Sequence, residues 1–238
     1  CNKPKEAFFA RAKAAFFGWF PWVGMLGLWV AAVALTLLVA LVVLRPVRER
    51  TRARGVQEKW LASAHALWGQ ATARYNQLFP SKCPIPLRFG GLPSTPYTRW
   101  LTRYVLKSAR GITGYQELLE TVEYMTQGPG FTSCREQGER AWQLSRASSL
   151  LGMAMVLGWA SRRELVERSR GVCRQIQGQF SSWDEFYLAF LDHFSGAHHG
   201  EGAPNDKEAV RHRVDCYWEL KKRPDGLYSL PWDLDLEG

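Results

Sequence analysis

The sequence lacks the short motifs by which most catalytic and metal-binding domains are recognised. It contains no H-E-x-x-H, no paired C-x-x-C, no G-x-S-x-G and no glycine-rich phosphate loop with its lysine. Its five cysteines, at positions 1, 83, 134, 173 and 216, are odd in number and widely spaced, which favours a reducing compartment over a disulfide framework. We therefore expect a non-enzymatic protein without a cofactor.

Charged residues are absent from positions 16 to 44. About 20 apolar residues, at a rise of 1.5 Å each, cross a hydrocarbon core about 30 Å thick. The run also lacks the polar stripe of a surface helix. We expect an interfacial segment, then one transmembrane helix over about 16–44, then a basic flank to residue 54. The expected membrane-interface residues are Trp19, Phe20, Trp22, Arg45, Arg48 and Arg50.

The net charge of +9 is concentrated beside this run. Residues 1–54 hold nine Lys or Arg and two Asp or Glu, a net of +7, which leaves 22 basic and 20 acidic residues for the rest. Basic flanks of a membrane helix attract anionic lipid headgroups. The location of the charge therefore indicates lipid, and not nucleic acid, as its partner.

The same charges bear on topology. Four Lys or Arg precede the predicted span and five follow it, which favours a cytoplasmic C-terminal domain at the bacterial inner membrane. Ala32, Thr36 and Ala40 recur every four residues and could form a homo-oligomer contact between transmembrane helices, or simply reflect the frequency of alanine in such helices. Because residue 1 is Cys, we expect a truncated or processed chain.

Residues 55–238 have the patterns of an all-α domain. Helical periodicity, caps and Gly or Pro stops predict seven helices, over 56–79, 96–110, 115–127, 139–157, 161–180, 182–194 and 206–222. Four starts look like caps: Thr95-Pro96, and the boxes beginning at Thr113, Ser161 and Ser182. The proline-rich stretch 80–96 is expected to be an ordered loop or linker. The fold class is therefore one transmembrane helix followed by a globular domain of about seven helices.

Residues 138–196 carry a recognisable pattern. It consists of Ala141, Trp142, Leu144 and Arg146, then Gly158 and Trp159, then Phe180, Ser182, Trp183, Glu185 and Phe186. This pattern resembles the bacterial family known as domain of unknown function 1266, over roughly 56–232. Upstream, the family's Trp and Gly-His are replaced by Arg110 and Gly128-Pro129. The resemblance implies an all-α fold and says little about function.

Histidines and a cysteine gather between residues 192 and 216. The metal-ligand candidates are His193, His198, His199, His212 and Cys216. The spacing fits no established zinc motif, so a solvated loop and a core cysteine are the simpler interpretation.

Trp142 and Arg146 lie one helical turn apart and are expected to stack as a cation–π pair. Arg146 would either pair with Asp184 or Glu185 as a structural tie, or recognise an anion or a partner. The candidate partner-binding or anion-binding residues are Trp142, Arg146, Trp183, Glu185, Trp100 and Trp218, of which the last two would be partner hot spots if they are exposed.

The sequence thus predicts a membrane-anchored helical module that binds a protein partner. Two alternatives stay open. One is an immunity-type protein that neutralises a bacterial toxin, and the other is a metal-dependent enzyme that uses the histidine-rich segment 192–216.

Overall fold

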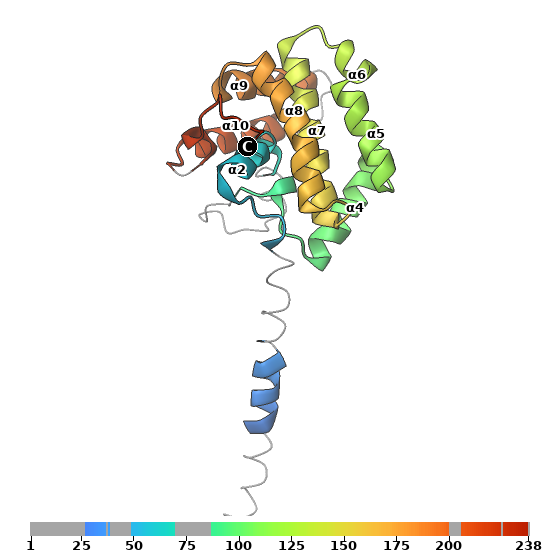
Figure 1. The fold of residues 1–238 in the computed structure, drawn as a ribbon, viewed down its shortest axis with the longest axis vertical. Coiled ribbons are helices and arrows are strands. Elements are labelled where there is room, and N and C mark those ends of the chain that lie inside the picture. Colours follow the sequence, from blue (N-terminus) through green and yellow to red (C-terminus); the bar gives the residue numbers. More distant parts are fainter. Residues whose placement is uncertain are drawn as a thin grey trace, which may run out of the picture. The chain divides into compact units, whose positions relative to one another are not determined.

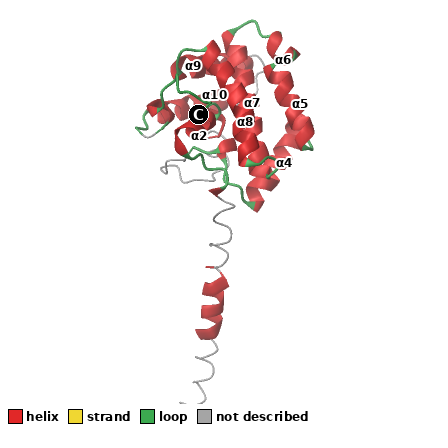
Figure 2. Cartoon of the chain, in the orientation of Figure 1, coloured by secondary structure: helices red, strands yellow, loops and turns green. Residues whose placement is uncertain are grey.

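The computed structural model describes residues 27–36, 38, 49–69, 87–199, 206–224 and 226–237. The chain divides into two compact units, residues 1–47 and 48–238. Within the described residues the structure is helical, with one isolated antiparallel bridge, between Arg52 and Arg88, and no strand. Figure 2 shows this all-helical architecture, which confirms the predicted fold class of the domain.

The described part of the first unit is a helix over 27–36. Its side chains are exposed, and Thr36 donates its hydroxyl proton to the carbonyl oxygen of Ala32, 2.7 Å away. Among the described residues no helix is long and apolar enough to cross a membrane. The remainder of the predicted 16–44 span lies outside the described residues, as do Trp19, Phe20, Trp22, Arg45 and Arg48.

The second unit is built from helices of very different lengths (Figure 1). They are α2 (Gly55–Ser63), α4 (Pro96–Arg110), α5 (Tyr115–Thr126), α6 (Pro129–Thr132), α7 (Gln137–Leu157), α8 (Arg162–Gln179), α9 (Trp183–His199) and α10 (Asp206–Lys221), with the 3-10 turns η1 (Phe89–Gly91) and η2 (Leu227–Ser229).

Helix α7 is the centre of the domain. It packs against α5, α8, α9 and η1 (Figure 1). Nearly every residue from Leu144 to Leu157 is buried, because small and apolar side chains occur on all sides of this stretch. A helix that is apolar all round has to be enclosed by its neighbours. The burial of α7 therefore accounts for the arrangement of the other helices around it.

Most predicted helix boundaries are confirmed. Thr95 accepts from the backbone N–H of Thr98, with Pro96 at the first helical position, and Ser161 and Ser182 accept from Glu164 and Glu185. The box predicted at Thr113 is wrong. Gly114 caps α5 without a side-chain bond, because the Thr113 N–H and hydroxyl both bond to the carboxylate of Glu117.

The helix predicted over 56–79 is interrupted in its described part. It ends at Ser63, and a turn at Ala64 and His65 precedes a new helical turn over 66–69. Side chains from other helices bind the carbonyls at this break: the Tyr187 hydroxyl donates to Ser63, and Ser145 donates to Ala64 at 3.1 Å. Tertiary hydrogen bonds therefore replace those of a continuous helix.

Two segments without predicted helices are nonetheless part of the core. In the described part of the proline-rich stretch, Phe89, Gly90, Gly91 and Leu92 are buried. After α10, the carboxyl-terminal segment 226–237 packs against α2 and α9, and Trp232 contacts both Trp60 and Trp183.

Candidate functional site

Aromatic side chains cluster where the first half of α7 meets α9. The Trp142 ring stacks on Phe190, with centroids 5.4 Å apart and planes 26° apart, and also contacts Phe194 and Trp68. The guanidinium carbon of Arg146 lies 5.5 Å from the Trp142 ring centroid, which confirms the predicted cation–π pair. This cluster fixes the Trp142 ring at the protein surface.

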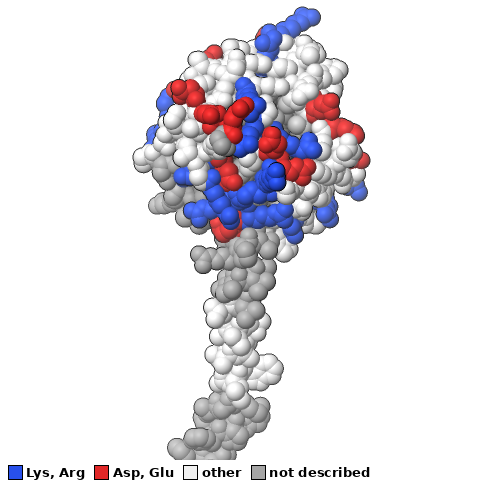
Figure 3. Space-filling view, in the orientation of Figure 1, with Lys and Arg blue, Asp and Glu red and all other residues white. Residues whose placement is uncertain are grey.

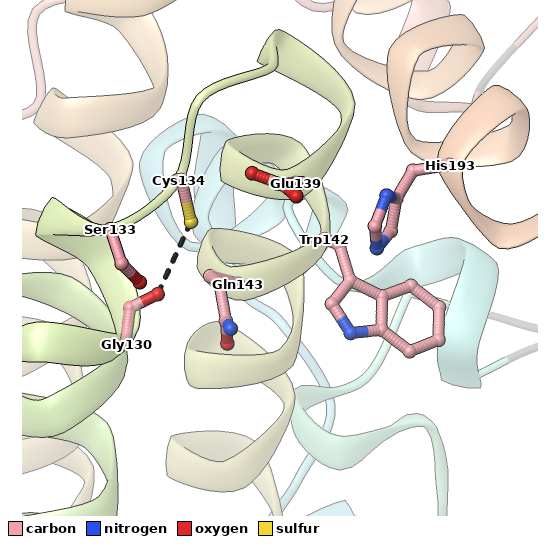
Figure 4. A pocket seen from close by; sticks show the side chains of 7 residues that line it. All are labelled: Gly130, Ser133, Cys134, Glu139, Trp142, Gln143 and His193. Atoms are coloured by element: carbon pink, nitrogen blue, oxygen red, sulfur yellow. Dashed lines mark hydrogen bonds between the residues drawn. The ribbon is translucent and has the colours of Figure 1, made fainter. Parts of the chain in front are cut away.

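Beside Trp142 lies an open pocket of about 200 Å³, formed by α6, α7 and α9 (Figure 4). Its lining residues are Gly130, Ser133, Cys134, Glu139, Trp142, Gln143 and His193. Only Trp142 and His193 were predicted as site residues. Nothing in the local pattern marked the other five, because α6 is a four-residue helix that periodicity does not reveal.

The acid and the thiol in this pocket have structural partners. Glu139 accepts from the backbone N–H groups of Arg135, at 2.7 Å, and Glu136, at 3.4 Å, and these bonds hold the pKa of its carboxyl below the usual range. The Cys134 thiol donates to the carbonyl oxygen of Gly130 at 3.2 Å, and burial raises its pKa. At neutral pH the thiol is therefore protonated, which is unlike an activated nucleophile.

Gln143 contributes a buried and unbonded acceptor to the pocket. Its Oε1 atom is buried and has no hydrogen-bond partner among the described residues. Trp142 forms the adjacent wall, and His193 meets the Trp142 ring edge-on with centroids 5.7 Å apart. The pocket thus combines an aromatic wall with a buried acceptor that suits an incoming N–H or O–H group.

The structure places Trp183 and Glu185 in supporting positions. Trp183 is buried against Trp60, with centroids 4.6 Å apart, and donates its indole N–H to the carbonyl of Leu230. Glu185 accepts from the backbone N–H of Ser181 at 2.6 Å, and bonds from Ser181 lower its pKa. Both residues therefore hold the start of α9 in place.

The predicted carboxylate partners of Arg146 are wrong. Glu185 binds Ser181, as described above, while Asp184 pairs with Lys221 at 2.7 Å and accepts the Tyr217 hydroxyl at 2.7 Å. Arg146 instead contacts the Trp142 ring, and burial lowers its pKa. The alternative interpretation, in which Arg146 recognises an anion or a protein partner, stays a prediction.

Trp100 and Trp218, the two tryptophans singled out from the sequence as candidate partner hot spots, are both exposed. Trp100 on α4 is 62% exposed and Trp218 on α10 is 49% exposed. The two rings have different neighbours. Trp218 contacts Tyr217 and Lys221, whereas Trp100 belongs to a row of exposed rings on α4.

The metal candidates are not brought together among the described residues. Cys216 is fully buried on α10, His193 lines the pocket by Trp142, and no group of three potential ligands occurs in the described part of the chain. The side chains of His198 and His199 lie outside the described residues.

Arg50, predicted at the membrane interface, belongs to the domain. Its Nη2 donates to the carbonyl oxygen of Ala160 at 2.8 Å. Arg99 approaches the same place, where its Nε donates to the carbonyl of Val156 at 3.3 Å. Both guanidinium groups therefore lie at the carboxyl-terminal end of α7, where positive charge is favourable, and Arg99 binds one of the last carbonyls of the helix.

His65 was missed by sequence reasoning. Its Nε2 accepts the Gly90 N–H at 2.9 Å, so the proton is on Nδ1 and is donated to Ser148 Oγ at 2.8 Å. Complete burial lowers the pKa of His65 to about 4. The imidazole is thus a neutral link between η1 and α7. A single histidine within a helical sequence pattern gives no sign of such a link.

Comparison with known proteins adds one match. Residues 130–232 match the model of a family described as "Protein of unknown function (DUF1266)", which confirms the resemblance over that part of the chain. The match does not extend to the upstream segment. No curated protein and no solved structure matches the chain.

Proposed function

We propose, from the match of residues 130–232 to the DUF1266 model, that the chain is a membrane-tethered helical module that binds a protein partner without catalysing a reaction. Residues 16–44 are the proposed single-pass tether in the bacterial inner membrane, with the domain on its cytoplasmic side. The contact with the partner is proposed to include the pocket beside Trp142.

The observation that carries this proposal is the unpaired acceptor in that pocket. A buried polar atom without a partner costs about 1–3 kcal/mol, so a donor from outside would be bound favourably by Gln143. All seven lining residues fall within the matched segment. The volume of about 200 Å³ is below the range of about 300–1,000 Å³ typical of small-molecule sites and suits one protruding side chain.

A toxin is one form that such a partner could take. In that case the same pocket would receive a side chain of the toxin, and the immunity-type function would be a special case of this proposal. No observation on the described residues favours the metal-dependent enzyme over it.

Two neighbouring residues at the end of α6 provide a matched test. Thr132 and Ser133 are both exposed, and each donates its hydroxyl proton to a backbone carbonyl four residues earlier. Only Ser133 lines the pocket. A Ser133→Arg substitution places a long side chain at the mouth of the pocket. A Thr132→Arg substitution adds the same charge beside the pocket.

Full-length tagged protein is isolated from its native membranes, and co-purifying proteins are quantified. We expect one partner to be retained by the original protein and by Thr132→Arg, and to fall about tenfold with Ser133→Arg. Equal retention by the two variants would show that the pocket is not the contact. The absence of any specific partner would contradict the binding function itself.

A further inference from the structure

Helix α4 exposes a row of three aromatic rings. Tyr97, Trp100 and Tyr104 are each more than half exposed, and their rings stack in order, with centroids 6.3 Å and 5.9 Å apart and planes 27° and 15° apart. The opposite side of the helix is buried through Thr98, Thr102 and Leu106. The aromatic row therefore does not contribute to the core of the domain.

The charge on this helix has one sign. Of its 15 residues four are Lys or Arg and none is Asp or Glu. Arg103 and Lys107 are exposed, one turn apart, on the same helix as the aromatic row. Figure 3 shows Lys and Arg interspersed with Asp and Glu over the lower part of the domain, so the single sign of charge belongs to α4 itself, which presents a basic surface. Such a surface is complementary to a negative one.

The start of α4 lies beside the first residues of the domain. A β-carbon placed on Gly158 would be 2.7 Å from Nη2 of Arg99 and 3.3 Å from Nη1 of Arg50, so the two guanidinium groups are neighbours. In the sequence, six peptide steps separate Leu44, the end of the proposed tether, from Arg50. An extended chain spans at most about 3.5 Å per residue, or about 21 Å here. The aromatic row thus begins at the end of α4 that neighbours Arg50, close in sequence to the residue at which the chain enters the domain.

We propose that the exposed face of α4, formed by Tyr97, Trp100, Tyr104, Arg103 and Lys107, lies against the anionic headgroups of the membrane. This inference rests on the proposed tether. Tyr and Trp favour the headgroup level because each has an apolar ring and one polar group, and Arg and Lys beside them bind lipid phosphate. A protein hot spot, in contrast, is usually a desolvated pocket with a surrounding rim, which this convex row of rings is not.

The test uses the full-length protein in nanodiscs of phosphatidylcholine with 30% phosphatidylglycerol. The photo-crosslinker p-benzoylphenylalanine replaces Trp100, or, as the matched control, the exposed Trp218. Lipid adducts are quantified by mass spectrometry. We expect at least tenfold more lipid adduct from position 100 than from position 218, and a several-fold decrease when Arg103→Gln and Lys107→Gln are combined or when phosphatidylglycerol is omitted.

Failures of the two proposals are distinguishable. If the chain inserts but positions 100 and 218 give equal lipid adducts, the α4 proposal alone is wrong. If position 100 in native membranes gives a protein adduct and no lipid adduct, the face binds a protein instead. If the chain is released from membranes by alkaline carbonate, the tether is wrong and the α4 inference is overturned with it.

Discussion

The backbone of Gly152 in the central helix α7 touches the backbone of Gly90 in η1. A β-carbon on Gly152 would lie 2.1 Å from the Gly90 nitrogen, and one on Gly90 would lie 2.7 Å from the Gly152 carbonyl oxygen. Gly90 also has a φ of +69°, which L side chains rarely adopt. This contact seats the loop before α4 directly on the core helix and positions the Gly90 N–H that bonds to His65.

Substitution of Gly152 by alanine should therefore be costly. The added methyl group meets backbone, which cannot rotate away, and overpacking of this kind costs about 1–3 kcal/mol or more. Gly171→Ala on α8 is the control, because nothing lies within 4 Å of its added carbon, and we expect it to stabilise the helix by about 0.5–1 kcal/mol. Chemical denaturation of the two variants should shift in opposite directions, and shifts of the same sign would contradict the proposed contact.

The buried His65 predicts a specific dependence of stability on pH. Its pKa falls from 6.5 in the unfolded chain to about 4 in the fold, so below pH 6.5 the unfolded state takes up the proton first. The free energy of unfolding should then fall by about 3 kcal/mol between pH 6.5 and pH 4 from this group alone. At pH 7 the imidazole is neutral in both states and makes no such contribution.

A His65→Gln variant separates this effect from that of the carboxyl groups. Several carboxyls, including Glu164 and Glu185, also have lowered pKa values and weaken the fold as the pH falls. These groups are common to both proteins. We expect the variant to be less stable at pH 7 but to lose less stability between pH 6.5 and 4, and parallel pH curves would exclude His65 as the cause.

Local sequence signals predicted the helices well because the interactions behind them are local. The Thr95 cap, the Ser161 cap and the Gly158 stop each involve residues within a few positions of one another. The break at His65 could not be predicted in this way. It depends on Gly90 and Ser148, which are 25 and 83 positions away in the sequence.

The candidate site shows the same limit. Trp142 and Arg146 are one turn apart, and their stacking follows from helix geometry alone. The pocket beside them depends on α6 and on His193 of α9, which approach α7 only in the folded domain. The sequence predicts a carboxylate partner for Arg146 because it shows only the signs of the charges. In the folded domain Asp184 pairs with Lys221 instead.

Arg162 joins α8 to the first residues of the domain. It pairs with Glu58, and its Nη2 donates to the carbonyl oxygens of Arg50, at 2.6 Å, and Arg52, at 3.0 Å. An Arg162→Ala substitution removes the donor to the carbonyl oxygens of Arg50 and Arg52, which we expect to cost about 1–3 kcal/mol. Hydrogen exchange of residues 50–54 should accelerate at least tenfold. Arg163→Ala, at the exposed neighbouring position, is the control and should leave exchange there unchanged.

The carboxyl-terminal segment 226–237 is predicted to be essential for stability, although its sequence forms no regular helix. Trp232 contacts Trp60 and Trp183 with ring centroids 5.5 Å and 5.0 Å away, and its indole N–H donates to the carbonyl of Phe180 at 3.0 Å. Gln177 binds the carbonyl of Trp232 at 2.7 Å from the other side. The segment therefore joins α2, α8 and α9.

A Trp232→Ala substitution removes the ring from this junction, and we expect it to lower the free energy of unfolding by about 3–5 kcal/mol. Trp218→Ala is the matched control, since that ring is half exposed and its loss should cost less than about 1 kcal/mol. Thermal unfolding of the two proteins, with limited proteolysis after residue 223 as a second readout, provides the measurement. If Trp232→Ala is no less stable than Trp218→Ala, the segment is a surface appendage and the three helices are held together by their own contacts.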